Sequence, residues 1–384
     1  MGRVMKQLRY GMVGGGSGSF IGEQHRRAVR LDGLAVLVAG CFSRSLEKNN
    51  KICEEWNIDN DRRYSDFLEM AEKEKEREDK IDFVVIATPN ANHYLAAKAF
   101  LNAGIHVVCD KPLCIDSSEG EELERLSKEK DLLFMVTYTY MGHVTAKSIS
   151  RNIKAGKIGK IRTIIAEYPQ DGIAKMKYLN QKPSGWRLDK AQGGSTYCLA
   201  DIGTHVENAV VSMTGLKVKK VLAKLDTMIP ETILDDNDMI LVELENGATG
   251  MFWMSKIALG NANGFRVRIF GETGSIEWNQ EKCEEYKLMD GEGNLSVCRR
   301  TNKHPGLGAS EYSRLPAGHT EGFIEAMANL YKSFINCIVA KYEGNFTEDM
   351  IDYPTVSDGL QGVKFVEACV KSSDNGNVWV EVVE

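Results

Sequence analysis

The first 138 residues alternate short apolar strands with helices, and this alternation constrains the fold more than any other feature of the chain. Strands are expected at residues 9–14, 34–39, 82–87, 105–109 and 132–137, and helices separate them. Buried apolar strands that are joined through helices form a parallel sheet covered on both faces. The sequence therefore predicts an α/β domain of the Rossmann type over residues 1–138.

Beyond residue 138 the pattern changes to strands that are joined by tight turns. Asn246-Gly247 and Glu272–Gly274 are typical of hairpins, so the second sheet should be mainly antiparallel. Two late helices, at 321–341 and 355–372, are expected to cover one face of this sheet. We therefore expect an α+β domain with a large, mainly antiparallel sheet over residues 139–384, and a tight interface with the first domain.

Composition favours a small-molecule partner. The net charge is −6 and no block of Lys and Arg occurs, which argues against nucleic acid and against an anionic membrane surface. No window has the roughly 18 apolar residues of a membrane span, and the first ten residues lack the apolar core of a leader, so a cytoplasmic protein is expected. The nine cysteines form no CxxC pair and should be reduced and buried, and no metal site is expected.

A glycine-rich loop runs from Gly14 to Gly22, between the first predicted strand and the first predicted helix. Glycines at this place let backbone N–H groups approach a pyrophosphate at the helix N-terminus, although a plain glycine loop is the alternative. Gly14 and Gly16 fit the dinucleotide fingerprint and Ser19 stands at its third position, with the loop one or two residues longer than usual. The predicted cofactor contacts here are Gly14, Gly16, Ser17, Gly18, Ser19, Phe20 and Ile21.

The end of the second strand bears on the choice of cofactor. It reads Gly40-Cys41-Phe42-Ser43-Arg44, without the carboxylate that usually binds the ribose of NAD. Ser43 and Arg44 could bind a 2′-phosphate, or Ser43 could bind the ribose while Arg44 stacks on adenine. The sequence is therefore compatible with either NAD(H) or NADP(H) as the cofactor.

Three residues are candidates for acid–base chemistry. Lys111 follows a buried strand at its carboxyl end, where it could stabilise negative charge on a reacting oxygen, or simply pair with Asp110. Pro112 favours a fixed local geometry, with a cis bond as one option. Asp201 and His205 stand four residues apart, so a helix that begins near residue 203 would place them one turn apart. His205 could accept a proton, whereas a hydrogen-bonded core histidine is the alternative.

Other polar and aromatic residues suit a sugar or a nicotinamide. Trp186 and Arg187 combine an aromatic face with a cation, although packing between domains would also explain them. Tyr168 and Gln170 end a strand. His319 stands in a glycine-flanked polar loop before a helix. The candidate substrate contacts are Tyr138, Tyr168, Gln170, Asp201, His205 and His319.

These motifs together resemble the Gfo/Idh/MocA oxidoreductase family over nearly the whole chain. The residues that carry the resemblance are the Gly14–Gly22 loop, Thr88-Pro89-Asn90 with His93, Asp110-Lys111-Pro112, and Asp201 with His205. The resemblance implies that Lys111, Asp201 and His205 form the catalytic set, and it adds Thr88, Pro89, Asn90, His93, Asp110, Lys111, Trp186 and Arg187 to the expected cofactor contacts. Asp110 replaces the Glu that is usual in the family.

The resemblance also implies an activity. The long glycine loop, Trp186-Arg187, residues 260–264 and residues 316–322 are similar to the branch of levoglucosan and glycoside 3-dehydrogenases. The expected function is therefore NAD(P)-dependent oxidation of a secondary ring hydroxyl of a pyranose, glycoside or anhydrosugar, at carbon 3. Alternatives are an inositol (cyclitol) dehydrogenase, an enzyme that keeps its cofactor bound and uses a 3-keto intermediate, and a nucleotide-binding sensor. A homodimer or homotetramer built through the second sheet is expected.

Overall fold

The computed structural model describes residues 7–301 and 307–382 and separates into two compact units. The first unit contains the described residues up to Cys114, residues 118–137 and Met327–Leu360. The second unit contains Ile115–Ser117, Tyr138–Ala326 and the described residues from Gln361 on. No helix in the described part of the chain combines the length and the apolar character that crossing a bilayer requires.

The first unit is built on a five-stranded parallel sheet in the order β2-β1-β3-β4-β5. All five residues of the central strand β3 are buried, because both faces of the sheet are covered and the sequence there is a continuous apolar run. This sheet confirms the predicted Rossmann fold. Its strands are β1 (Leu8–Gly14), β2 (Ala35–Cys41), β3 (Phe83–Ala87), β4 (His106–Cys109) and β5 (Phe134–Val136).

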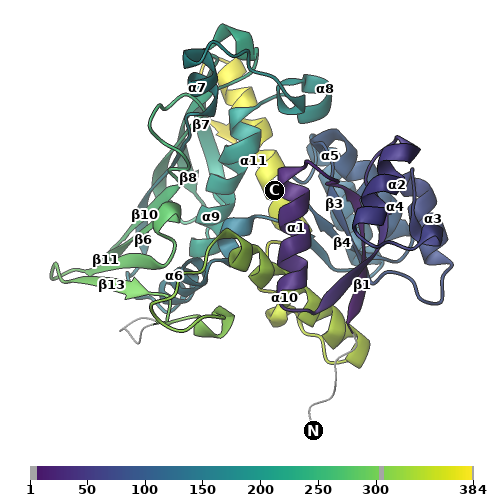
Figure 1. Cartoon of the computed structure of the whole chain (residues 1–384). Helices are drawn as coiled ribbons and strands as arrows, with labels where there is room; N and C mark the ends of the chain where they lie inside the picture. The colour runs from purple at the N-terminus through teal and green to yellow at the C-terminus, as the bar shows by residue number, and fades with distance from the viewer. Residues whose placement is uncertain (1–6, 302–306, 383–384) are drawn as a thin grey trace. The chain divides into compact units, whose positions relative to one another are not determined.

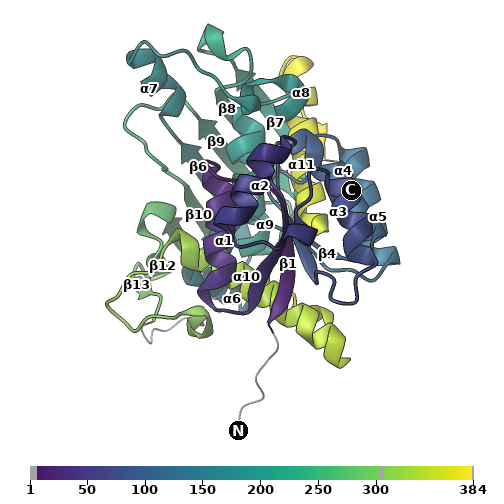
Figure 2. The same cartoon turned by 45° about the vertical axis from the view of Figure 1, so that its right-hand side comes forward.

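Side-chain caps set where several helices of this unit begin. Ser19 accepts from the N–H of Gly22 at the start of α1, and Asp66 accepts from two N–H groups at the start of α3. Helices α3 and α4 lie side by side (Figures 1 and 2). The helices are α1 (Phe20–Leu31), α2 (Leu46–Glu55), α3 (Phe67–Lys75), α4 (His93–Asn102) and α5 (Ser117–Glu129).

One late helix corrects the predicted division of the chain. The sequence placed both late helices on the second sheet, yet α10 (Phe323–Glu343) belongs to the first unit from Met327 on. The reason is aromatic packing, because Tyr331 and Phe334 contact Phe83 of β3 with ring centroids 6.4 and 5.7 Å away. Residues 327–360 are thus grouped with a domain from which they are distant in sequence.

The second unit contains a nine-stranded sheet in the order β13-β12-β11-β10-β6-β9-β8-β7-β14. Strands β6 and β9 run parallel, whereas the other neighbouring strands described in this sheet are antiparallel, as the turn signals predicted. The strands are β6 (Ile161–Pro169), β7 (Val218–Asp226), β8 (Asn237–Leu244), β9 (Thr249–Ser255), β10 (Arg266–Gly271), β11 (Gly274–Asn279), β12 (Glu285–Asp290), β13 (Leu295–Arg299) and β14 (Val380–Glu381).

Helices α6, α9 and α11 lie along one face of this sheet (Figure 1). Phe365 of α11 contacts Phe252 of β9, and both are fully buried in an apolar core that also contains Trp278. On the strands, side chains of the opposite face include the half-exposed Met239, Leu241 and Met251. The remaining helices are α6 (Val144–Lys154), α7 (Gly172–Tyr178), α8 (Lys190–Gly193), a π-helix (Leu199–Gly203), α9 (Thr204–Thr214) and α11 (Val356–Asp374).

Candidate active site

The glycine loop of the first unit leaves no room for side chains at two positions. A Cβ atom on Gly14 would lie 2.6 Å from the carbonyl oxygen of Ala87, and its φ of +73° also favours glycine. A Cβ atom on Gly22 would lie 1.9 Å from the carbonyl oxygen of Gly15. Gly22 therefore allows the close approach of α1 to the glycine loop. The sequence analysis had this glycine at the end of the loop without assigning it that role.

The loop ends at the N-terminus of α1, and the N–H groups of a helix N-terminus attract anions. Phe20, at this end, is 72% exposed. A backbone cradle that a Cβ would fill, at a helix N-terminus, fits the pyrophosphate of a dinucleotide. Of the predicted cofactor contacts, Ser17, Gly18, Phe20 and Arg44 are exposed, whereas Gly14, Gly16, Ser19, Ile21, Ser43, Thr88 and Pro89 are half-buried.

Lys111 is half-buried, just beyond the end of β4. Its backbone N–H donates to Oδ1 of Asp110 at 3.0 Å, and the same oxygen accepts from the hydroxyl of Thr137 at 2.9 Å. Asp110 thus fixes the backbone of the lysine loop. The Lys111–Pro112 peptide bond is cis, which was one of the two options.

His93 is fully buried and contacts two loops. Its Nδ1 lies 2.8 Å from the carbonyl oxygen of Pro112, and its Nε2 lies 2.9 Å from that of Thr88. Burial lowers the pKa of His93, and the nearby Asp110 opposes this effect. His93 therefore holds together the segments after β3 and β4, and its expected contact with the cofactor stays a prediction. Asn90 is buried as well.

Asp201 and His205 lie in the second unit, on two different kinds of helix. Asp201 is in the π-helix Leu199–Gly203, and His205 is in the first turn of α9. The helical conformation thus begins before residue 203, where we expected it to start. Asp235 stabilises the start of the π-helix, because its carboxylate accepts from the N–H groups of Tyr197 and Leu199 at 2.6 and 2.8 Å. Turns of π-helix are frequent at functional sites.

Two cations flank the carboxylate of Asp201. The Nζ of Lys256 lies 2.5 Å from Oδ2, and the Nε of Arg187 lies 3.3 Å from Oδ1. The side chain of Lys256 is only 6% exposed. Burial is the largest single effect and disfavours the charged form, yet Asp201, Tyr197 and Cys198 together raise the pKa of Lys256. Lys256 is therefore a buried ammonium that the sequence analysis missed.

Arg187 also lies over the ring of Trp186, at 4.4 Å from the ring centroid. The predicted pair is thus a real aromatic–cation contact. Within the second unit its guanidinium points toward Asp201, so this arginine contributes to the surroundings of a predicted catalytic residue.

Three tyrosine rings surround the imidazole of His205. The ring centroids of Tyr138, Tyr140 and Tyr168 lie 5.7, 4.9 and 6.2 Å from that of His205. All three tyrosines are buried, whereas His205 is half-buried. Tyr138 and Tyr168 were predicted as substrate contacts, and Tyr140 was not predicted. Burial of these rings restricts the orientation of the imidazole.

Amide side chains connect the tyrosines with Lys256. Gln170 accepts from Nζ of Lys256 at 2.7 Å and donates to Oδ1 of Asn263 at 2.8 Å. Asn263 also accepts from the hydroxyl of Tyr168 at 2.6 Å and donates to that of Tyr140 at 3.3 Å. Gln170 was predicted. Asn263 lies in the 260–264 segment, which was noted only for its resemblance to other sequences.

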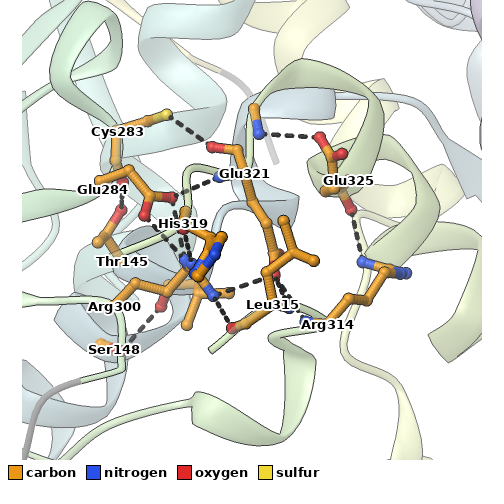
Figure 3. Close-up of polar contacts among 12 residues, drawn as sticks. Thr145, Ser148, Cys283, Glu284, Arg300, Arg314, Leu315, His319, Glu321 and Glu325 are labelled. Carbon is orange, nitrogen blue, oxygen red and sulfur yellow. Dashed lines mark hydrogen bonds and ion pairs between the residues drawn. The ribbon is translucent and has the colours of Figure 1, made fainter. Parts of the chain in front are cut away.

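His319 is exposed in a loop that is anchored by buried charges (Figure 3). Arg300 donates to the carbonyl oxygen of His319 at 2.6 Å and to Oε1 of Glu321 at 3.0 Å. The side chains of Arg300 and Glu321 are each 4% exposed. The loop is therefore anchored through the backbone of His319, and the residue itself is exposed.

One group of potential metal ligands occurs among the described residues. It consists of Cys198, Asp235 and Asp238, whose ligand atoms lie within 4.8 Å of one another. Burial raises the pKa of Asp238 well above its ordinary value, and the adjacent Asp235 adds to this effect. The groups that interact with the Asp238 carboxyl by hydrogen bonding are the other two members of this group, Cys198 and Asp235. All nine cysteines are free thiols, and eight of them are buried, as expected.

Comparisons with known proteins match both parts of the chain. Residues 8–138 match the oxidoreductase family with an NAD-binding Rossmann fold, and residues 147–277 match the GFO/IDH/MocA C-terminal domain. The uncharacterized oxidoreductase YfiI of Bacillus subtilis is 35% identical, over 98% of both chains. Levoglucosan dehydrogenase of Pseudarthrobacter phenanthrenivorans is 28% identical, over 79% of this chain and 80% of that protein.

A solved structure is similar over nearly the whole length. It is an inositol dehydrogenase homolog from Azotobacter vinelandii, complexed with NADH and myo-inositol, with 32% identity, a TM-score of 0.89 and coverage of 98% of each chain.

Proposed function

Because the chain belongs to the Gfo/Idh/MocA oxidoreductase family and is an NAD-dependent dehydrogenase, we propose that it oxidises a secondary ring hydroxyl of a pyranose, glycoside or anhydrosugar to a ketone. Carbon 3 is the proposed position, and the reaction is reversible. The family and the relatives support a sugar or polyol as the substrate class.

The surroundings of Asp201 and His205 carry this proposal. A half-buried imidazole and a carboxylate stand in a network of tyrosine hydroxyls and amides, within one unit. Such a site offers many hydrogen-bonding groups, which recognition of a polyol requires. Its aromatic rings suit the apolar face of a sugar ring.

The proposed mechanism assigns a separate role to each of three residues. His205 takes the hydroxyl proton on an imidazole nitrogen as the C–H bond breaks. Lys111 binds the same oxygen and stabilises the negative charge that develops on it. Asp201, held by Lys256 and Arg187, fixes a neighbouring hydroxyl of the substrate. Bound NAD⁺ supplies the acceptor for the hydride from that carbon, so the proton and the hydride both leave the alcohol.

We propose that the enzyme also tolerates NADP. The four residues after β2, from Phe42 to Ser45, contain no carboxylate that would repel a 2′-phosphate. Arg44 is exposed, and the hydroxyl of Ser43 accepts from the N–H of Ser45 at 3.2 Å. Arginine is well suited to binding phosphate.

A homodimer or homotetramer that forms through the second sheet is proposed as well. Met239, Leu241 and Met251 are 55%, 46% and 46% exposed on neighbouring strands β8 and β9. A contiguous apolar surface of this kind typically marks a protein–protein contact. Nine free thiols in one chain support a reducing compartment such as the cytoplasm.

A cyclitol is the second candidate substrate, since the similar structure from Azotobacter vinelandii binds myo-inositol. The experiment that tests both candidates is a cofactor-reduction screen with NAD⁺ and NADP⁺ over inositols, hexoses, anhydrosugars and aryl glycosides. We expect turnover of at least one ring alcohol, with the ketone located by NMR of the product. A Lys111→Met variant should lose most of this turnover. An inactive wild type across the panel would contradict the proposal.

A further inference from the structure

Lys256 lies at the point where two parallel strands end side by side. It directly follows β9, and Gln170 directly follows β6, with Pro169 paired to Ser255 in the register of these strands. The N–H of Gln170 donates to the carbonyl oxygen of Ser255 at 2.7 Å, which ties the two strand ends together. Both side chains therefore emerge at the same edge of the sheet, which is why they meet.

The ammonium of Lys256 has a partner on each side. It donates to Oδ2 of Asp201 at 2.5 Å and to Oε1 of Gln170 at 2.7 Å, and it lies 5.4 Å from the ring centroid of Tyr197. An ammonium has three donors, so two hydrogen bonds and one aromatic face hold it in a single position. A buried ammonium with these contacts can hold the side chains of Asp201 and Gln170 in fixed positions.

The contacts continue from Lys256 to the rings around His205. Gln170 binds Asn263, and Asn263 binds the hydroxyls of Tyr168 and Tyr140, which are themselves 2.5 Å apart. The Nδ2 of Asn263 also donates to Oε1 of Gln280 at 2.9 Å. Tyr140 and Tyr168 then contact the imidazole. One chain of hydrogen bonds thus links the surroundings of the carboxylate with those of the imidazole.

We propose that Lys256 is a positioning residue that holds Asp201 and, through Gln170 and Asn263, the tyrosine rings that orient His205. The inference rests on the proposed function, because it assigns Asp201 and His205 to the reaction. Lys256 itself is not proposed to touch the substrate or the cofactor. Its removal should therefore disturb the orientation of catalytic groups more than the binding of NAD⁺.

The test compares Lys256→Met with Lys256→Arg and with a control, Lys224→Met. Lys224 is an exposed lysine of the same sheet that pairs with Asp226 at 2.6 Å, so the control removes an ion pair with the same chemical change. With levoglucosan or myo-inositol and NAD⁺, kcat of Lys256→Met should fall about 10²-fold, as expected for misplaced catalytic groups. The KM for NAD⁺ should not change. Lys256→Arg, which keeps the charge, should recover part of the rate.

A second measurement does not depend on turnover. NMR of isotope-labelled histidine side chains resolves His205, because the chain has seven histidines and His205→Asn identifies the missing signal. The signal of His205 should move in Lys256→Met and stay unchanged in Lys224→Met. An unmoved signal would overturn the inference, and so would a moved signal with wild-type kcat. If the wild type oxidises no ring alcohol of the screened panel, the proposed function fails, and the NMR result alone decides the role of Lys256.

Discussion

At the scale of single residues, local sequence indicates candidates for acid–base chemistry but not the residues that surround them. The assignment of Lys111, Asp201 and His205 to catalysis comes from residue types and local sequence, and it stays a prediction. Lys256 and Asn263 were missed, because they reach the site through strand pairing between segments that are far apart in the sequence. Tyr140 was missed because a buried tyrosine after a strand is ordinarily a core residue.

The first prediction concerns the charge of Asp201. Asp201→Asn leaves the ammonium of Lys256 and the guanidinium of Arg187 without their shared carboxylate. We expect kcat/KM for the sugar to fall by about 10²-fold or more, because a misplaced catalytic geometry has this effect. The measurement is steady-state kinetics with NAD⁺. Asp226→Asn, which removes an exposed carboxylate paired with Lys224, is the matched control and should keep wild-type kinetics.

A second prediction at this scale concerns Asp238. Burial raises its pKa, so between its ordinary value of 3.8 and its folded value the native state holds a proton that the unfolded chain has lost. Stability therefore decreases as the pH rises through that window. Asp238→Asn cannot ionise, so it should be more stable than the wild type at neutral pH, by about 1–3 kcal/mol, the size of the desolvation penalty for a buried polar group.

Urea unfolding at pH 5 and pH 8 measures this difference. Asp235→Asn serves as the comparison, because Asp235 accepts from Tyr197 and Leu199 and its replacement should destabilise the protein. A wild type that is more stable than Asp238→Asn at pH 8 would show that the carboxylate contributes a favourable interaction, such as a bound metal ion.

At the scale of elements, the glycine loop and the first helix depend on each other. Gly22→Ala would place a Cβ atom 1.9 Å from the carbonyl oxygen of Gly15, so α1 must move away from the loop. We expect binding of NAD⁺ to weaken by at least about tenfold, since about 1.4 kcal/mol is sufficient for that change. Calorimetric titration with NAD⁺ measures it. Gly172→Ala, where nothing lies within 4 Å of the new atom, is the control, and equal affinity in both variants would refute the prediction.

The sequence predicted the local elements well and the distant pairings poorly. The parallel sheet of the first unit follows from β-strands and helices that alternate along the chain. The parallel pairing of β6 with β9 and the packing of α10 on β3 join segments that no local pattern connects. The π-helix could not be predicted either, because its conformation depends on Asp235, which lies more than thirty residues further along the chain.

At the scale of the whole molecule, buried histidines make both units sensitive to acid. Burial lowers the pKa of His106 in the first unit and of His143 in the second unit to about 4. From pH 6.5 down to about 4 the unfolded chain binds protons that the folded state excludes, so stability falls with the pH in that window. The difference between a pKa of 6.5 in the unfolded chain and about 4 in the folded state corresponds to about 3 kcal/mol of folding stability for each histidine.

Unfolding with urea at a series of pH values tests this prediction. His106→Asn retains an acceptor for the N–H of Leu133, which His106 Nδ1 now binds at 2.9 Å, but it cannot titrate. Its stability should therefore depend less steeply on pH than that of the wild type. Identical pH profiles for the two proteins would be inconsistent with a lowered pKa of His106.

The central claim for the whole enzyme is that His205 accepts the proton of a ring hydroxyl while NAD⁺ accepts the hydride. The most direct test is the rate of NADH formation by wild type and His205→Asn on whichever sugar or cyclitol the screen identifies. We predict that the variant binds NAD⁺ as the wild type does and turns over about 10²–10⁴-fold more slowly, the usual contribution of a general base. A variant with wild-type turnover would contradict the claim.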